Sequence, residues 1–347
     1  MFFEEPVAHG KGPNWLRIER VLDHVSIATP YVDKDLSLAK LIDVQRQFIE
    51  TLTKDRKGEQ TIAWYYTPMA YSFAGSVPFD ATLYDCMDEL SCFKNAPNQI
   101  AAKERELLAE ADLVFAGGRS LYDAKRRLHD NVHLFPSSVD VAHFLPARAP
   151  GLEPEDQAAL GKPRIGYYAV IDERFDIPFF RKVAQLRPDW TFVVIGPVAK
   201  ISEEDLPHED NIEWLGMRDY RDLPSYMRGW DAVLMPFALN ESTRYISPTK
   251  TPEFLAAGLP VVSTPVADVV SEYGSSGLVE IAATAEEAVA KLDVVMRRER
   301  TAWLERVDAH LQRSSWSETW QKMEARIEEA LDRKTEPMPE ILEAAHV

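Results

Sequence analysis

The stretch SPTKTPEFLAAGLPVVST, residues 247–264, predicts a short helix followed by a buried strand. Prolines stand at the start of the helical segment, and Gly258 is a typical residue just beyond a helix end. The apolar, β-branched run at 261–264 is typical of a strand that is covered on both faces. Lys250 and Glu253 lie in the first turns of this otherwise apolar helix, and their presence there requires an explanation.

Two starting points fit the helix. Ser247 can cap it with Pro248 at the first helical position, or Thr251 can cap it with Pro252 there. With the first start, Pro252 lies inside the helix and should distort it. With either start, Lys250 projects at the end that attracts phosphate, because free N–H groups and the helix dipole give that end a partial positive charge.

The spacing of the two charges suggests a nucleotide-sugar site. Glu253 lies one turn after Lys250, on nearly the same face of the helix. A lysine can neutralise a diphosphate, and a carboxylate can accept hydrogen bonds from both hydroxyls of a ribose. The alternative is an ordinary ion pair on the helix surface, since Lys–Glu pairs at this spacing are common.

Strand-like and helix-like segments alternate along most of the chain, which predicts doubly wound α/β domains with parallel sheets. Before the proline-rich segment at 146–163, strands are expected at 25–29, 61–66, 81–85, 111–116 and 131–136, and helices at 35–52, 97–110 and 119–128. After it, strands are expected at 164–170, 191–197, 211–216, 231–237 and 260–264, and helices at 176–187, 219–228, 249–257 and within 284–332.

This pattern predicts two Rossmann-like α/β domains that face each other across a cleft. The expected parts are an acceptor-side domain at 1–147, a linker at 148–163, a nucleotide-sugar domain at 164–312, a terminal helix at 313–333 and a tail at 334–347. Because open parallel sheets bind ligands at the carboxyl ends of their strands, the default site lies between the two domains.

Composition narrows the class of protein. A formal net charge of -17 repels phosphate backbones, so nucleic-acid binding is not expected. The two cysteines allow neither a disulfide framework nor a cysteine-rich zinc site, which fits a reducing cytoplasm. No apolar run approaches the ~20 residues of a membrane span. The eight histidines lack metal-ligand spacing, so no catalytic metal and no cofactor are expected.

The region around the opening stretch resembles a known family. PFALNESTRYISPTKTPEFLAAGLPVVST (236–264) is similar to the donor-site signature of family 4, a large retaining group of GT-B glycosyltransferases, and closest to a bacterial subset with NE-x-T-R-x-I-S-P-T-K. Segments 84–89, 111–126, 131–140 and 166–176 resemble the same subset. The resemblance implies a GT-B fold, transfer with retention from a nucleotide-diphosphate sugar such as a UDP- or GDP-sugar, and ribose binding by Glu253.

Three features depart from the family pattern. Where the family has a second glutamate, eight positions before the first, this chain has Tyr245, and Glu241 lies nearby at a different spacing. Many members have a histidine where this chain has Met87, next to Asp88, so no histidine-based role carries over. The chain opens on MFFEEPV, which reads as a second strand. The first strand is therefore expected upstream or from another segment, such as a second copy in a homodimer.

Charged loops after the strands add further candidates. Arg174, in VIDERFD (170–176), is expected to contact the donor diphosphate, and the alternative is an ion pair with Asp172 or Asp176. Asp88 is expected to orient or deprotonate the acceptor hydroxyl. The alternative for Asp88 or its neighbour Glu89 is a helix cap.

The predicted site combines these residues. The catalytic group consists of Asp88, Lys250 and Arg174, and the donor-binding group consists of Glu253, Lys250, Arg174, Gly196, Thr249, Ser247, Arg218 and Glu241. A basic cluster at Arg119, Lys125, Arg126 and Arg127 indicates either a solvated helix face or contact with acidic lipid or a lipid-phosphate acceptor at the inner membrane face.

The sequence therefore predicts a cytoplasmic glycosyltransferase that moves a sugar to a saccharide or lipid-linked hydroxyl acceptor in bacterial polysaccharide or glycoconjugate synthesis. Since a fold does not fix a function, two alternatives stay open. One is an epimerase or phosphorylase on the same fold. The other is a degenerate transferase that serves as a nucleotide-binding or assembly subunit, which Tyr245 and the missing first strand favour.

Overall fold

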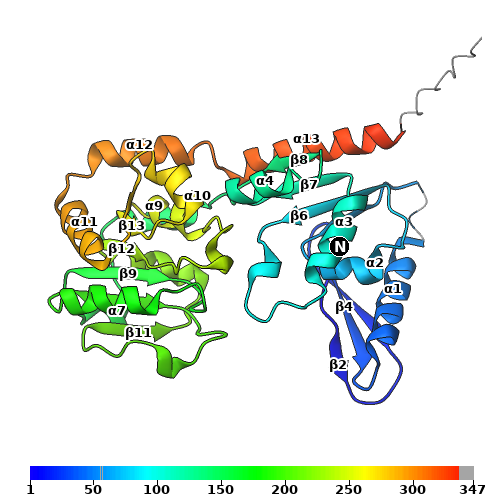
Figure 1. The fold of residues 1–347 in the computed structure, drawn as a ribbon, viewed down its shortest axis with the longest axis horizontal. Helices are drawn as coiled ribbons and strands as arrows, with labels where there is room; N and C mark the ends of the chain where they lie inside the picture. Colours follow the sequence, from blue (N-terminus) through cyan, green and yellow to red (C-terminus); the bar gives the residue numbers. More distant parts are fainter. Residues whose placement is uncertain (55, 57, 336–347) are drawn as a thin grey trace, which may run out of the picture. The chain divides into compact units, whose positions relative to one another are not determined.

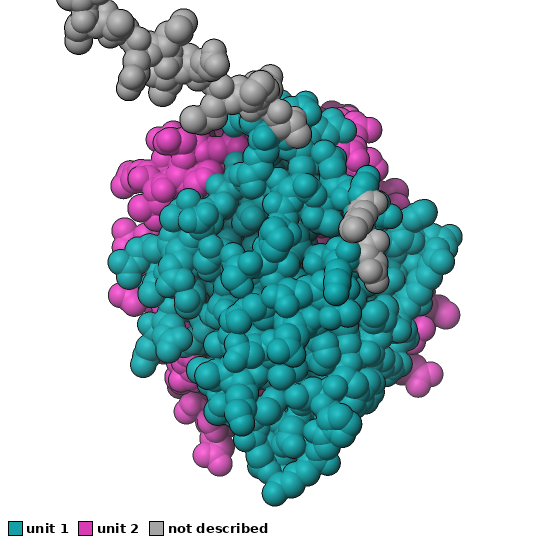
Figure 2. Space-filling view, turned by 90° about the vertical axis from the view of Figure 1, so that its right-hand side faces the viewer, with its two compact units in different colours: residues 1–85, 97–114, 327–347 teal, residues 86–96, 115–326 magenta. Residues whose placement is uncertain are grey.

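The computed structural model describes residues 1–54, 56 and 58–335, so the predicted tail lies outside the described residues from position 336 onward. The chain forms two compact units, coloured separately in Figure 2. The first comprises 1–85, 97–114 and 327–347, and the second comprises 86–96 and 115–326. The domain boundaries expected from the sequence stay a prediction.

The first unit begins with a small mixed sheet around β4 (Val25–Asp33). β1 (Phe2–Phe3) and β2 (Val7–His9) pair with β4 in parallel, whereas β3 (Trp15–Leu22) pairs with it antiparallel. The strand expected at 25–29 is thus the start of β4, and β3 was not expected. Most of β3 is exposed, so burial does not dictate its composition, and the brief alternation at Leu16–Glu19 is too short to predict an eight-residue strand.

A second sheet has the order β5-β6-β7-β8 (Figure 1). Its strands are β5 (Ile62–Tyr65), β6 (Ala81–Cys86), β7 (Leu113–Ala116) and β8 (Val132–Leu134). They match the strands predicted at these positions, and β7 is buried along its whole length. α1 (Leu38–Lys54) precedes β5. The helices between the strands are η1 (Pro68–Ala70), α2 (Tyr71–Ala74), η2 (Leu90–Cys92), α3 (Ile100–Glu110) and α4 (Arg119–Lys125).

The second unit contains a six-stranded sheet in the order β11-β10-β9-β12-β13-β14. The strands are β9 (Arg164–Tyr168), β10 (Thr191–Ile195), β11 (Ile212–Gly216), β12 (Ala232–Met235), β13 (Val261–Ser263) and β14 (Val279–Ile281). Every neighbouring pair is parallel. β9, β10, β12 and β13 are buried almost throughout, whereas β11 and β14 are partly exposed. The five strands predicted after position 163 are confirmed. The three-residue β14 was not expected.

The chain order reverses at β9, which has β10 on one side and β12 on the other. This is a topological switch point, where the carboxyl ends of adjacent strands leave room for a ligand. Because crossovers are right-handed, the helices after β9 and after β12 cover opposite faces of the sheet. These helices are α7 (Ile177–Leu186) and α9 (Lys250–Ala256). α7 packs with α11 (Ala285–Arg297), and α9 packs with α12 (Thr301–Leu311).

Shorter elements complete this unit. They are α5 (Val141–Phe144), η3 (Leu145–Arg148), α6 (Glu155–Ala158), η4 (Glu203–Asp205), η5 (Tyr220–Asp222), α8 (Leu223–Met227), η6 (Glu241–Thr243), α10 (Ala267–Val269) and η7 (Val270–Gly274). The last helix, α13 (Trp316–Thr335), corresponds to the terminal helix predicted at 313–333.

Candidate active site

The loops that follow β9 and β12 are joined to each other at the switch point. The Asp176 amide donates to the Pro236 carbonyl at 2.7 Å, and the Ala238 amide donates to the Arg174 carbonyl at 2.8 Å. A β-bridge between Phe175 and Phe237 lies between these bonds. The two loops therefore form one backbone platform at the carboxyl edge of the sheet, and most of the predicted donor-site residues lie on it or directly after it.

Helix α9 starts at Lys250, between the two predicted starting points. Neither Ser247 nor Thr251 is its cap residue. Thr249 holds that position with helical dihedral angles and without a side-chain cap bond. Pro252 is the third helical residue, where it does not disturb the hydrogen-bond ladder, because N–H groups in the first turn have no partner within the helix. The expected distortion is therefore absent.

Glu253 lies at the centre of a small polar cluster. Its Oε2 accepts hydrogen bonds from the Tyr168 hydroxyl and from Lys250 Nζ, the latter at 3.1 Å. Lys250 Nζ also lies 4.8 Å from the centre of the Tyr168 ring. Burial, together with the nearby Glu253 charge, raises the pKa of Tyr168 far above its ordinary value, so this hydroxyl remains a donor.

The other carboxylate oxygen of Glu253 accepts no hydrogen bond from any residue that the structure describes. The side chain is nevertheless only 13% exposed, so its position is fixed by Tyr168 and Lys250. The ion pair that the sequence offered as an alternative is thus present. It leaves one oxygen of a well-held carboxylate available to a hydroxyl group.

Tyr220 is a site residue that the sequence did not indicate. It follows β11 in the short helix η5, and half of its surface is exposed. Burial raises its pKa, and the next largest contribution comes from the charge of Glu253, which places the two side chains near each other. Its ring stacks on His143 at 4.1 Å. No sequence pattern marks it, because its place beside Glu253 depends on the sheet order.

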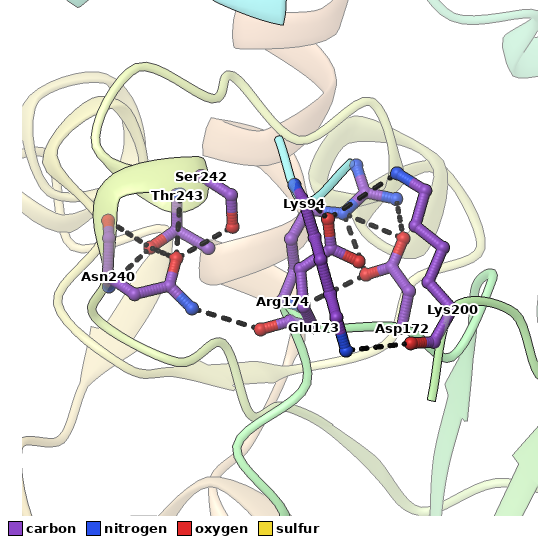
Figure 3. A network of polar contacts seen from close by, with 8 residues as sticks. All are labelled: Lys94, Asp172, Glu173, Arg174, Lys200, Asn240, Ser242 and Thr243. Atoms are coloured by element: carbon purple, nitrogen blue, oxygen red, sulfur yellow. Dashed lines mark hydrogen bonds and ion pairs between the residues drawn. The ribbon is translucent and has the colours of Figure 1, made fainter. Parts of the chain in front are cut away.

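Arg174 forms a two-pronged ion pair with the buried Asp172 (Figure 3). Arg174 Nε lies 2.9 Å from Oδ1, and Nη2 lies 2.7 Å from Oδ2. Burial opposes the charge on the guanidinium, but the bonds with Asp172 and the charge of Asp88 raise the pKa of Arg174 overall. The predicted alternative, a pair with Asp172, is what the structure contains, whereas Asp176 caps α7 through the Phe179 amide.

A network of polar contacts extends from this pair (Figure 3). Glu173 accepts a hydrogen bond from the Lys94 amide at 3.1 Å and pairs with Lys200 at 3.4 Å. Its backbone carbonyl accepts a bond from Asn240 Nδ2 at 2.9 Å. Lys94 Nζ in turn donates to the Lys200 carbonyl. Loops after β6, β9, β10 and β12 are therefore tied together within the second unit.

Asp88 belongs to the same surroundings. Burial raises its pKa, and the charges of Arg174 and Lys200 oppose that rise. Neither Asp88 nor Glu89 caps a helix with its side chain. Glu89 precedes η2 without a cap bond and pairs instead with Lys125 at 2.7 Å. Asp88 thus lies close enough to Arg174 to sense its charge, which is compatible with the catalytic group predicted from the sequence.

One member of the predicted basic cluster is not on a solvated face. Lys125 is only 2% exposed, because its ammonium group is buried against Glu89. Arg119 and Arg126 both lie over the ring of Tyr122. The cluster therefore divides into a buried structural lysine and an outer set of arginines, and periodicity could not separate them, since the partner of Lys125 lies 36 residues earlier.

The remaining predicted donor-site residues differ in their surroundings. Gly196 has φ +140°, and a Cβ there would lie 1.7 Å from the Ala169 carbonyl oxygen, so the strand ends need glycine at this point. Arg218 pairs with Asp156 at 2.8 Å and with the Tyr226 hydroxyl, and it contacts no other predicted site residue. A Cβ at Gly118 would lie 2.7 Å from Ser247 Cβ, so Ser247 faces the start of α4.

The carboxyl group of Asp85, near the end of β6, is expected to make the stability of the fold depend on pH. It is 5% exposed and accepts a hydrogen bond from Trp64 Nε1 at 3.1 Å. Burial raises the pKa of Asp85 from 3.8 to about 6. Below pH ~4 the carboxyl group is protonated in both the folded and the unfolded protein. Between pH ~4 and ~6 only the unfolded state ionises, so stability is lost as the pH rises.

Asp85→Asn should therefore gain stability relative to the parent as the pH rises from 4 to 7, by at most about 3 kcal/mol, since one pKa unit corresponds to about 1.4 kcal/mol. The measurement is urea unfolding of both proteins at pH 4 and pH 7. The amide keeps an acceptor for Trp64, so a difference that does not change with pH would contradict the assignment.

No group of three or more His, Cys, Asp or Glu side chains in residues 1–54, 56 and 58–335 is placed to hold a metal ion. Within the same ranges, every helix is too short or too polar to span a bilayer.

Comparison with known proteins bears on this site directly. Residues 166–297 match the family described as "Glycosyl transferases group 1", and this match includes the platform and Glu253. The chain has the GT-B fold. Solved structures with that fold cover most of it: sucrose-phosphate synthase from Thermosynechococcus elongatus has a TM-score of 0.63 at 15% identity and covers 94% of this chain and 89% of its own. The resemblance inferred from residues 236–264 is confirmed.

Two further structures of this fold are complexes with uridine nucleotides. Anabaena Alr3699/HepE in complex with UDP has a TM-score of 0.65 at 16% identity and covers 87% of this chain and 86% of its own. The structure described as "Trehalose-6-phosphate from E. coli bound with UDP-2-fluoro glucose" has a TM-score of 0.69 at 12% identity. The match covers 94% of this chain and 91% of that one. At these identities the likeness shows the fold.

A curated relative gives a sequence match. "Putative teichuronic acid biosynthesis glycosyltransferase TuaH" of Bacillus subtilis (strain 168) is 27% identical over 225 residues, which are 60% of this chain and 56% of the relative. The chain therefore matches little more than half the length of that relative. The comparisons support a transferase enzyme of the group 1 type, and the activity and substrates of the whole protein are matters for a proposal.

Proposed function

We propose that the protein is a retaining glycosyltransferase that takes a sugar from a nucleotide-diphosphate sugar and transfers it to a hydroxyl acceptor without a metal ion. The observation that carries this proposal is Glu253, which is fixed by Tyr168 and Lys250 and keeps one oxygen without a hydrogen-bond donor among the described residues. It lies on the helix after β12, at the switch point where doubly wound sheets bind nucleotides.

Each residue of the cluster has a role in this proposal. The available oxygen of Glu253 accepts hydrogen bonds from the ribose hydroxyls. The bond between Lys250 Nζ and Glu253 weakens when the donor binds, and the ammonium group then neutralises the departing diphosphate. Charge that develops on a leaving group is best stabilised by a preorganised cation. Arg174 adds a second cation, already held in place by Asp172. Asp88 orients the acceptor hydroxyl and, at a pH above its raised pKa, accepts its proton.

The biological setting is also part of the proposal. UDP complexes among proteins of the same fold favour a UDP-sugar as the donor. The name of the TuaH relative favours a saccharide or lipid-linked acceptor in the synthesis of a cell-surface polysaccharide. A cytoplasmic location, with transient contact at the inner membrane face through the outer arginines of α4, fits this setting.

Glu253→Ala should weaken nucleotide binding about 10- to 100-fold, which corresponds to the ~1.5–3 kcal/mol of hydrogen bonds to a charged group. The measurement is calorimetric titration with UDP, GDP, TDP and ADP, followed by sugar forms of the nucleotide that binds. Glu286→Ala is a matched control, because Glu286 is an exposed glutamate in the first turn of α11. A folded Glu253→Ala protein that binds its nucleotide as the parent does would show that the ribose assignment is wrong.

A further inference from the structure

A hollow of about 530 Å³ opens at the carboxyl edge of the sheet, between the loops that follow β12 and β13. Glu241 and Arg244 line it from the first loop, together with Asn240 and Thr243. Pro265 and Ala267 line it from the second loop and give it an apolar surface, beside the buried Val266. Since β12 is the strand beside the switch point, the hollow lies on the edge of the sheet where ligands bind.

The two charged side chains of this hollow differ from the other site residues. Arg174, Lys200 and Lys250 each form an ion pair with an acidic side chain. The guanidinium of Arg244 makes no hydrogen bond or ion pair with any residue in the described part of the chain, and its Cζ lies 5.2 Å from the centre of the Tyr245 ring. The Glu241 carboxylate likewise has no hydrogen-bonding or ion-pair partner among those residues.

Glu241 and Arg244 do not pair with each other, although they are three residues apart on one turn, a spacing at which opposite charges usually interact. Both side chains are exposed. A cation and an anion therefore lie side by side at the rim of one hollow, each available to a ligand.

The backbone that carries them is held rigidly. Asn240 Oδ1 accepts hydrogen bonds from Ser242 Oγ at 2.7 Å and from the Thr243 amide at 3.2 Å (Figure 3). Thr243 Oγ1 donates to the Ala238 carbonyl at 2.5 Å, and Asn240 Nδ2 donates to the Glu173 carbonyl. The turn is thus fixed to the platform, so binding at its charges requires little ordering of the backbone.

We propose that this hollow binds a sugar that carries an anionic group. A guanidinium can hold a carboxylate or a phosphate with two parallel hydrogen bonds, so Arg244 binds the anion. The carboxylate of Glu241 accepts hydrogen bonds from the sugar hydroxyls, and the apolar surface of Pro265 and Ala267 meets the C–H face of the ring. This inference rests on the proposed function and deepens it, because it assigns the chemical class of a sugar that the enzyme takes, and the test below distinguishes donor from acceptor.

The test compares matched neutral and anionic probes by calorimetric titration. The donor arm uses UDP, UDP-glucose and UDP-glucuronic acid. The acceptor arm uses glucose, glucuronate and glucose 6-phosphate. Comparing the last two separates recognition of a carboxylate from recognition of a phosphate. Each sugar is titrated with and without saturating UDP. We expect one anionic probe to bind about 10-fold or more tightly than its neutral counterpart, as for a charge-assisted pair of hydrogen bonds.

Arg244→Gln should abolish that preference and leave the affinity for UDP unchanged, whereas Arg244→Lys should keep part of it. Arg127→Gln is the control for net charge, because Arg127 is an exposed arginine on another loop. Equal binding of neutral and anionic probes by the parent would overturn the inference, and so would a preference that persists in Arg244→Gln. A parent that binds none of UDP, GDP, TDP and ADP would instead contradict the proposed function, and the acceptor arm without UDP would still test the hollow.

Discussion

Lys250→Met is expected to slow sugar transfer about 100- to 1,000-fold, the range for the loss of one group that stabilises charge in a transition state. In the structure Lys250 Nζ lies 3.1 Å from Glu253 and over the Tyr168 ring, and the lysine side chain is 28% exposed. The ammonium group is therefore held at the switch point and remains accessible to a ligand. In the proposed reaction the departing diphosphate carries more negative charge than Glu253, so we expect the lysine to stabilise the transition state more than the ground state.

The measurement is the rate of nucleotide release in the presence of donor and acceptor. Lys250→Arg keeps the charge and should lose much less activity, which separates charge from side-chain shape. The dissociation constant for UDP should change far less than the rate. A Met variant that transfers sugar at the parent rate would show that the pair of Lys250 with Glu253 is only structural, which is the alternative that the sequence left open.

The core of the second unit could be predicted from the sequence, because its strands carry their own signal. Runs such as those at 191–195 and 232–235 are apolar and β-branched on both faces, as buried parallel strands require. The exposed β3 carries no such signal, and it owes its strand structure to pairing with β4. The local sequence pattern therefore predicted the buried strands, whose composition follows from burial. It did not predict β3, whose strand structure depends on pairing with β4.

The candidate site shows a similar division. Glu253 and Lys250 were found because both lie on one helix at a fixed spacing. Tyr168, which completes their cluster, comes from a strand 85 residues earlier, so no local pattern links it to Glu253. The start of α9 was mispredicted because two prolines gave conflicting signals, and the helix starts between the two positions that they favour. Among residues 1–54, 56 and 58–335, Arg244 has no hydrogen-bonding or ion-pair partner, which is a property of the folded loops. Its spacing alone would have predicted a pair with Glu241.

Lys125→Met should lower the free energy of unfolding by about 3–5 kcal/mol, the range for removing one partner of a buried ion pair. Lys125 is 2% exposed, and the side chain of Glu89 is 14% exposed. Methionine fills a similar volume, so the cost comes mainly from leaving the Glu89 carboxylate uncompensated in a region of low dielectric constant. Because some of Glu89 reaches water, the lower end of the range is expected. The measurement is urea unfolding at pH 7.

Two variants decide whether the charge causes the loss. Lys103→Met removes a lysine from an exposed pair with Glu106 and should change stability by about 0.5 kcal/mol or less, as surface ion pairs do. Adding Glu89→Leu to Lys125→Met should recover most of the stability, because replacing a buried pair by apolar side chains is often neutral. If the double variant stays as unstable as Lys125→Met, the loss comes from the other contacts of Lys125. Glu89 directly follows Asp88, so the pair also fixes the loop that presents Asp88, and the double variant should then fold normally yet transfer sugar more slowly.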